Sequence, residues 1–287
     1  MTEPLVELVR AELEQDVDPQ VTRLAEAIAA KHGDASRAVL FYGSCLREAK
    51  FDGLMLDFYL IVSDYRSAYG KRWLALANRL IPPNVFPFEL GGLAAKYAVV
   101  SERDFDRLNG PKTRSVSVWA RFAQPARLVW ASSQAARDRT VAAVARAAPT
   151  LLGSALPSVG HLDDELDLWR QAFALTYSAE LRAERKGRAV SVVDADPERY
   201  RRFTMPALAV AVRSSHGWMR RRLEGKALSV FRLAKASVTY AGGADYIVWK
   251  INRHAGTKFA LKPWQRRHPL LAAISLLPRL LRSGAIH

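Results

Sequence analysis

The chain of 287 residues contains one cysteine, Cys45. A single thiol excludes an internal disulfide framework and any metal site built from several cysteines, and such usage is typical of a reducing compartment. Long apolar runs are also missing, since none reaches the roughly 18 to 20 residues that a membrane-spanning helix needs. Residues 1–7 are acidic and lack the pattern of a signal or transit peptide. We therefore expect a cytoplasmic protein that does not cross a membrane.

Acidic residues are scarce relative to basic ones. The chain has 28 Asp and Glu against 43 Lys and Arg, which gives a formal net charge of +15 and a pI of about 10.2. This excess is larger than solubility requires and indicates a polyanionic partner: nucleic acid, a nucleoside triphosphate or an anionic membrane surface. Residues 182–235 hold 14 of the basic and 5 of the acidic residues. The second half of the chain is therefore expected to face the polyanion.

Apolar periodicity predicts an α/β core followed by helices. The order helix, strand, turn, strand, helix, strand is expected over residues 5–15 and 19–32, 38–42, 43–44, 54–62, 71–80 and 93–100. A helix at 104–109, a segment at 116–122 and a short strand at 125–130 follow. Further helices are predicted at 135–148, 163–188, 206–223 and 228–235. We expect domains at 1–133 and 134–260, with a soft boundary because no linker separates them.

The segment 261–287 carries an apolar stripe with basic flanks. Leu270, Ile274, Leu277 and Leu281 recur at helical spacing, and Arg266, Arg267, Arg279 and Arg282 flank them. A basic amphipathic helix of this kind suits an anionic bilayer surface. Packing against the protein body explains the same pattern, so both alternatives stay open.

The stretch with the most chemical content is a Gly-Ser turn between two apolar strands. Gly43 and Ser44 follow the first strand, and Asp57 lies near the start of the second. Backbone amides of such a turn can bind phosphate oxygens, and a strand-borne carboxylate can hold Mg²⁺ against the same phosphates. This is the minimal apparatus of a polymerase-beta-type nucleotidyltransferase. The alternative is a structural turn beside a capping aspartate.

A second carboxylate is expected two residues after the first in that fold, but Tyr59 stands there. The candidates for a second metal ligand are Asp64, Glu89 and Glu180. If none of them serves, the site has lost its activity.

Five segments together resemble the mitochondrial-type phosphatidate cytidylyltransferases, the CDP-diacylglycerol synthases with a nucleotidyltransferase fold. They are Tyr42-Gly43-Ser44, Met55-Leu56-Asp57-Phe58, Lys96-Tyr97-Ala98-Val99-Val100-Ser101, Ala120-Arg121-Phe122-Ala123-Gln124-Pro125 and Leu175-Thr176-Tyr177-Ser178-Ala179-Glu180-Leu181-Arg182. That family also lacks the second aspartate. Its pattern differs at Ala98, where it has Gly, at Gln124, where it has Lys, and at Ala179-Glu180, where it has Gly-Asp. The match covers residues 38–185.

The resemblance implies an α+β or α/β fold: a nucleotidyltransferase domain with a mixed sheet, a mainly helical second domain and a C-terminal amphipathic helix. It also implies transfer of CMP from CTP to phosphatidic acid, with Mg²⁺ as cofactor, at the inner face of a membrane. Two alternatives remain: a nucleotidyltransferase for another lipid or an RNA end, and a catalytically silent basic protein that binds RNA or lipid.

The resemblance assigns the following roles. Asp57, Lys96 and Arg121 would be catalytic, Asp57 and Glu180 would bind the metal, and the nucleotide would contact Tyr42, Gly43, Ser44, Tyr177 and Arg182. Without it, Lys96 reads as a strand-end lysine in solvent, Arg121 and Arg182 as surface ion-pair partners, and Glu180 as part of a solvated helix face.

Overall fold

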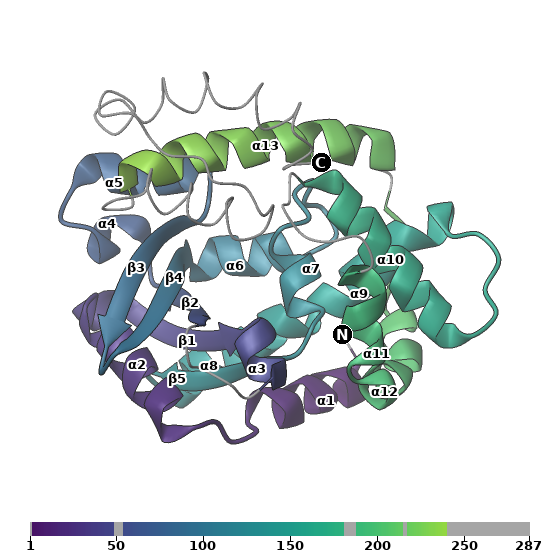
Figure 1. Cartoon of the computed structure of the whole chain (residues 1–287), viewed down its shortest axis with the longest axis horizontal. Coiled ribbons are helices and arrows are strands. Elements are labelled where there is room, and N and C mark those ends of the chain that lie inside the picture. The colour runs from purple at the N-terminus through teal and green to yellow at the C-terminus, as the bar shows by residue number, and fades with distance from the viewer. Residues whose placement is uncertain (1, 49–53, 181–187, 215–216, 240–287) are drawn as a thin grey trace.

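The computed structural model describes residues 2–48, 54–180, 188–214 and 217–239 (Figure 1). The strands are β1 (Ser36–Tyr42), β2 (Met55–Val62), β3 (Asn84–Leu90), β4 (Leu93–Ser101) and β5 (Ala126–Ala131). The helices of the first part are α1 (Glu3–Leu13), α2 (Pro19–Ala30), α3 (Ser44–Glu48), α4 (Tyr65–Ala68), α5 (Arg72–Leu80), α6 (Glu102–Asn109) and α7 (Trp119–Phe122). Those of the second part are α8 (Gln134–Ala145), α9 (Ala147–Ala155), α10 (Glu165–Ala179), α11 (Arg188–Asp194), α12 (Pro197–Leu208) and α13 (Trp218–Thr239).

The strands form one mixed sheet in the order β3-β4-β2-β1-β5. β2 and β4 are parallel, and the other neighbouring pairs are antiparallel. A parallel neighbour needs a crossover connection. Here α4, α5 and the edge strand β3 provide it, so β2 ends up at the centre of the sheet. The expected mixed sheet of an α+β protein is confirmed.

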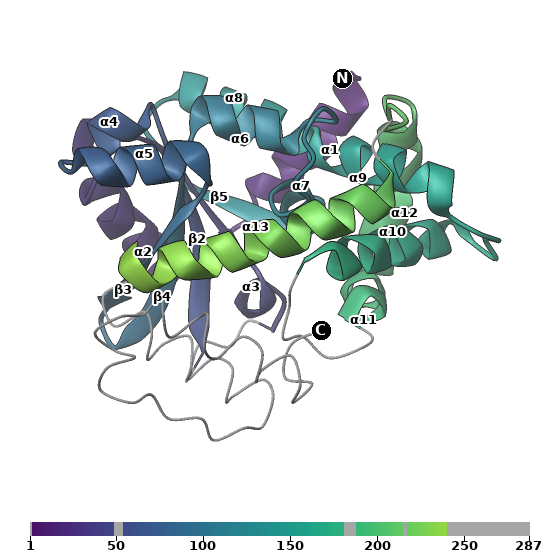
Figure 2. The ribbon, with the colours of Figure 1, turned by 90° about the horizontal axis from the view of Figure 1, so that it is seen from above.

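Helices cover both faces of the sheet, and side-chain alternation separates two cores. On one face Phe41, Phe58 and Tyr97 pack with α2 and with residues of α4 and α5. On the other face Leu40, Tyr59 and Ala98 pack with helices from both halves of the chain. The view from above shows α13 running across the molecule from the helical half to the β3 end of the sheet (Figure 2).

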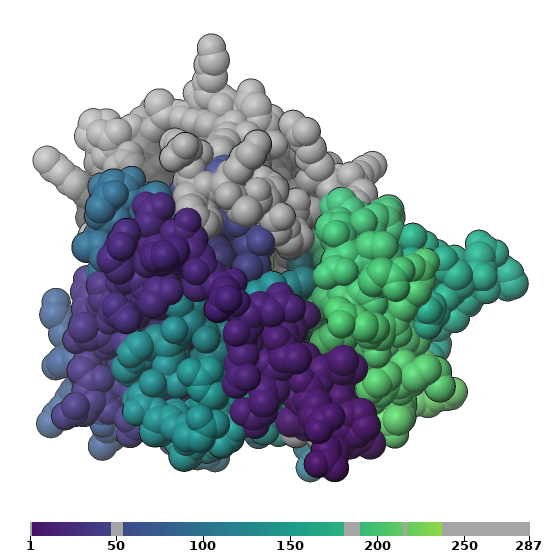
Figure 3. All heavy atoms as spheres, turned by 90° about the horizontal axis from the view of Figure 1, so that it is seen from below, coloured from purple at the N-terminus to yellow at the C-terminus, as the bar shows by residue number. Residues whose placement is uncertain are grey.

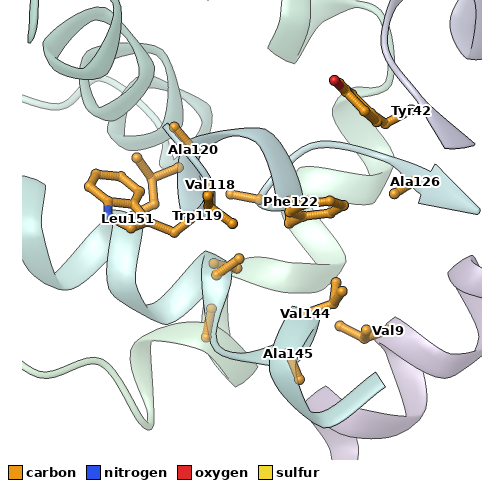
Figure 4. Close-up of a cluster of buried hydrophobic side chains, with 14 of the residues drawn as sticks. Val9, Tyr42, Val118, Trp119, Ala120, Phe122, Ala126, Val144, Ala145 and Leu151 are labelled. Carbon is orange, nitrogen blue, oxygen red and sulfur yellow. The ribbon is translucent and has the colours of Figure 1, made fainter. Parts of the chain in front are cut away.

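The second core is one continuous cluster that extends from the sheet into the helical half. Its largest members include Trp119, Phe122 and Trp169, which are almost completely buried. Phe122 points toward Ala126 and Val144 of this cluster, and Trp119 lies beside Leu151 (Figure 4). The boundary predicted at residue 133 stays a prediction, since residues on both sides of it share this core.

A buried ion pair joins the first helix to the second half of the chain. Seen from below, α1 lies against the green surface that contains α12 (Figure 3). Arg199 of α12 donates from Nη2 to Glu12 Oε1 at 3.0 Å, and also from Nε to Glu12 Oε2. Its Nη1 donates to the carbonyl of Ala123 at 3.0 Å. Burial lowers the pKa of Arg199, but Glu12, Tyr200 and Asp196 together raise it more, so Arg199 stays charged.

Most of the predicted elements in the first half are confirmed, whereas several boundaries and assignments differ, among them the helix expected at 163–188, which ends at Ala179. Neither α4, which lies between the strand and the helix expected at 54–62 and 71–80, nor the strand β3 was predicted. The helix expected at 135–148 is divided at Arg146 into α8 and α9. The helix predicted at 206–223 is wrong: Pro206 lies inside α12, and α13 begins only at Trp218. Pro206 was expected to begin this helix, but it lies in the last turn of α12. The predicted helix in 261–287 lies outside the described residues.

The Glu12–Arg199 pair yields a stability prediction. Replacing Glu12 by Gln leaves a buried arginine without its counter-ion, so we expect the free energy of unfolding to fall by about 3–5 kcal/mol. The exposed Glu14 offers a matched control, and Glu14→Gln should change it by less than about 0.5 kcal/mol. Urea denaturation of both variants measures the difference. Equal stability of the two variants would contradict the role of the pair.

Candidate active site

Three side chains of the central strands share one row of the sheet. Tyr42 of β1 pairs with Asp57 of β2, and Asp57 pairs with Lys96 of β4. Residues directly opposite each other project on the same face, and this face is the one that packs against the helical half. Asp57 Oδ1 lies 2.9 Å from Lys96 Nζ. The structure therefore brings together two of the residues predicted to be catalytic, and Lys96 is not a lysine in free solvent.

The glycine that ends the first strand lies against the Asp57 carboxylate. Gly43 has a φ of +98°, a conformation that glycine adopts without steric cost. A Cβ added there would lie 3.1 Å from Asp57 Oδ2. Ser44 follows as the first residue of α3. The turn predicted to bind phosphate and the carboxylate predicted to bind metal are thus direct neighbours, and the positive φ together with this tight contact favours glycine at position 43.

Arg121 reaches the same row from α7. Its Nη1 donates to the carbonyl of Ser117 at 3.0 Å and to the hydroxyl of Tyr59 at 3.4 Å. The guanidinium lies over the ring of Tyr42, 5.1 Å from the centroid. These contacts come from two strands and the turn before α7. Arg121 is therefore held in the site and is not a surface ion-pair partner.

The charge of Arg121 is fixed by its surroundings. Burial lowers its pKa, but the nearby phenols of Tyr42 and Tyr59 and the carboxylates of Glu180 and Asp57 raise it more, and the net shift is upward. Arg121 is thus a permanent cation that interacts electrostatically with both predicted metal ligands.

Glu180 follows α10 directly and is buried. Its Oε1 lies 3.3 Å from Nη1 of Arg232, whose Nη2 donates to the hydroxyl of Ser115 at 3.0 Å. α13 can carry Arg232 to this point because Gly225 lets the helix contact the carbonyl of Ala179. Glu180 therefore belongs to a buried polar network and not to a solvated helix face.

Within the described ranges, no group of three or more His, Cys, Asp and Glu side chains could hold a metal ion. Asp57 Oδ1 is buried and accepts no hydrogen bond from the described residues. Its contact with Lys96 Nζ is therefore an ion pair. Mg²⁺ at nucleotide sites uses one or two carboxylates and completes its shell with phosphate oxygens and water. Asp57 fits such a site. Glu180 shares an electrostatic partner with it, since both carboxylates act on Arg121.

The other two candidates for a second carboxylate lie elsewhere. Asp64 accepts hydrogen bonds from the backbone amides of Arg66 and Ser67 at the start of α4. It is seven residues from Asp57 along the chain, which corresponds to roughly 20 Å. Glu89 is exposed on the edge strand β3, two strands away from β2. Neither carboxylate adjoins Asp57.

Of the two remaining residues predicted to bind the nucleotide, the structure describes Tyr177 but not Arg182. Tyr177 on α10 is partly buried and packs against the second core. Arg182 lies outside the described residues. Their assignments to the nucleotide stay predictions.

Sequence reasoning missed Ser115 and Arg232. Arg232 belongs to a buried stripe on α13 with Arg221, Gly225 and Ser229, at steps of 4, 4 and 3 residues. This spacing was not recognised because the segment was divided between two predicted helices. A single helix over 218–239 would have placed Arg232 on the same face as Gly225.

Comparisons with known proteins identify no relative by sequence. No protein-family model matches the chain, and no curated protein matches it. One solved structure that is similar is a nucleotidyltransferase-like protein from Exiguobacterium sibiricum, with 11% identity, 92% of each chain covered and a TM-score of 0.29. At this TM-score the similarity does not establish a shared fold, so the functional argument depends on the geometry of the site.

Proposed function

We propose that the protein is a nucleotidyltransferase whose centre is the row of Tyr42, Asp57 and Lys96. The observation that carries this proposal is the contact between the Gly43 turn and the Asp57 carboxylate, with Lys96 and Arg121 beside it. An acceptor oxygen forms a bond to the α-phosphorus of the nucleotide. The bond from that phosphorus to the bridging oxygen breaks, and pyrophosphate leaves.

Each residue has a role that its position supports. Backbone amides at Gly43 and Ser44 bind triphosphate oxygens. Asp57 would hold Mg²⁺, together with Glu180 if that side chain extends to the same ion. The metal ion would neutralise negative charge on the triphosphate. Lys96 and Arg121 supply fixed positive charge where negative charge develops.

The specific substrates that we propose are CTP and phosphatidic acid. The five segments that resemble phosphatidate cytidylyltransferases support this choice, and they include the residues of the row. A phosphate acceptor is also chemically suitable, because it is already an anionic nucleophile near neutral pH. Positioning and charge neutralisation then suffice without a strong general base.

One contact favours a second candidate, a basic polyanion-binding protein without catalysis. Lys96 Nζ lies 2.9 Å from Asp57 Oδ1, the atom that would bind the metal. If Lys96 keeps this position when nucleotide binds, the lysine substitutes for the cation and turnover does not occur.

Product formation distinguishes the two candidates. The full chain is incubated with CTP labelled at the α-phosphate, Mg²⁺ and phosphatidic acid in vesicles, with diacylglycerol and RNA as alternative acceptors. We expect labelled CDP-diacylglycerol and pyrophosphate. Product from another acceptor would keep the nucleotidyltransferase and overturn the lipid substrate, and no product from any acceptor would favour the silent protein.

Asp57 yields the first catalytic prediction. Asp57→Asn keeps the size of the side chain but removes the charge that binds the metal, so kcat should fall roughly 100-fold or more. Asp16→Asn, on an exposed residue, is the matched control and should keep full activity. Turnover and thermal melting are measured for both. Full activity in Asp57→Asn would move the metal site elsewhere.

Gly43 yields a prediction about close approach. Gly43→Ala puts a methyl group against the Asp57 carboxylate, which must shift, so we expect turnover to drop about tenfold or more. Gly92 also has a positive φ, +78°, but a Cβ there meets no atom within 4 Å. Gly92→Ala therefore carries a comparable backbone strain without the contact. Similar turnover in the two variants would show that strain alone explains the loss.

The second carboxylate is tested by Glu180→Gln and Glu89→Gln. We expect the first to raise the Mg²⁺ concentration needed for half-maximal turnover about tenfold, because a metal ligand or its electrostatic partner is lost. The second should leave it unchanged, since Glu89 is exposed and two strands away. A change confined to Glu89→Gln would reverse the assignment.

A further inference from the structure

The helix α13 has the opposite polarity from an ordinary surface helix. After the buried Trp218 in its first turn, its inner side carries Arg221, Gly225, Ser229 and the half-buried Arg232, which are polar or small. The guanidinium of Arg221 donates to the carbonyls of Thr113 and Arg114, both at 2.9 Å. A surface helix of a globular protein normally turns its apolar stripe inward. The inner face of α13 is instead used for hydrogen bonds and ion pairs.

The outward side of the same helix is apolar. Met219 is 79% exposed and Leu223 is 69% exposed. At 100° per residue, both lie on the side of the helix opposite Gly225, together with Val230 and Ala227. The exposed cations Arg220, Arg222 and Lys226 flank this stripe.

A second helix repeats the pattern on the same side of the molecule. In α5, Trp73, Leu76 and Leu80 are exposed and share one face, and Leu80 is 70% exposed. Arg72 and Arg79 are exposed beside them. Both views show α5 near the C-terminal end of α13 at the β3 end of the sheet (Figures 1 and 2). Phe231, 58% exposed, lies in this later part of α13, whereas Met219 and Leu223 lie in its first turns. We call these exposed apolar residues of α5 and α13, with their flanking cations, the outer surface.

We propose that the outer surface binds an anionic lipid bilayer. Apolar side chains with arginine and lysine at their edges match the acyl boundary and the anionic headgroups of a bilayer. Among the described residues no helix is long and apolar enough to cross a membrane, so the binding is interfacial. The inference extends the proposed lipid substrate to a docking surface, but its evidence, the exposure and charge of two helices, is independent of catalysis.

Charge argues against two other occupants of the outer surface. A second copy would bring a formal charge of +15 against a basic surface. The chain's own residues 240–287 contain eight Lys and Arg and one acidic residue, so they would also be repelled by the cations of α5 and α13. An anionic bilayer is attracted by the same groups.

Docking in this way would couple the bilayer to the active site. α13 is one helix thick, about 10 Å, and its inner face carries Arg232, the ion-pair partner of Glu180. The same helix contacts β3 and α10. A lipid phosphate that leaves the bilayer beside α13 would therefore be within a short distance of the Glu180 network.

Vesicle binding of the full chain tests the proposal without CTP or Mg²⁺. The vesicles contain phosphatidylcholine alone or mixed with phosphatidylglycerol, which is not the proposed substrate. We expect co-sedimentation with the mixed vesicles only. Met219→Glu should weaken it tenfold or more, since it replaces a membrane-facing apolar group by an anion. Met205 on α12 is 71% exposed, so Met205→Glu is the matched control and should bind like the wild type.

Three results would overturn the proposal: no binding by the wild type, unchanged binding of Met219→Glu, or an equal loss in Met205→Glu. A dimer in solution that Met219→Glu dissociates, without vesicle binding, would make a second copy the occupant. If vesicle binding behaves as expected but no nucleotidyl transfer occurs, the proposed function fails and the docking surface stands. Thermal melting of both variants checks that they fold.

Discussion

The contact between the Gly43 turn and the Asp57 carboxylate is the constraint on which the site depends. It requires β1 and β2 to be antiparallel neighbours, with Tyr42 opposite Asp57, so that the turn after β1 meets the second strand near its start. It also requires a residue without a side chain at the turn, because a Cβ would lie 3.1 Å from the carboxylate oxygen. The parallel β4 then adds Lys96 on the other side of Asp57.

The helical half of the chain completes this site by electrostatics and packing. Arg121 lies over the ring of Tyr42. Burial lowers its pKa, but Tyr42, Tyr59 and the carboxylates of both halves, Glu180 and Asp57, raise it more. Glu180 is in turn held by Arg232 of α13. Burying charged side chains such as these is stabilising only if each of them is paired or hydrogen-bonded. The two halves therefore depend on each other, which agrees with the hydrophobic core that they share.

The sheet strands and their central chemistry could be predicted from the sequence because their signals are local. Apolar runs marked β1, β2 and β4, and the Gly-Ser turn and Asp57 lie within 15 residues of each other. The partners of Arg121 and Glu180 could not be predicted in this way. Ser115 and Arg232 are more than 100 residues apart in sequence and meet only through tertiary packing. The reversed polarity of α13 could not be predicted either, because a helix with a largely polar buried stripe and an apolar outer stripe has the same periodicity as an ordinary surface helix.

Calorimetric titration of CTP into the full chain, with and without Mg²⁺, tests the central claim most directly. If Asp57 binds the metal against the triphosphate, Mg²⁺ should tighten CTP binding at least tenfold in the wild type. The same addition should have little effect in Asp57→Asn, while that variant keeps the thermal stability of a folded protein. An equal Mg²⁺ effect in both proteins, or no CTP binding by the wild type, would contradict the claim that the Gly43 turn and Asp57 form a nucleotide site.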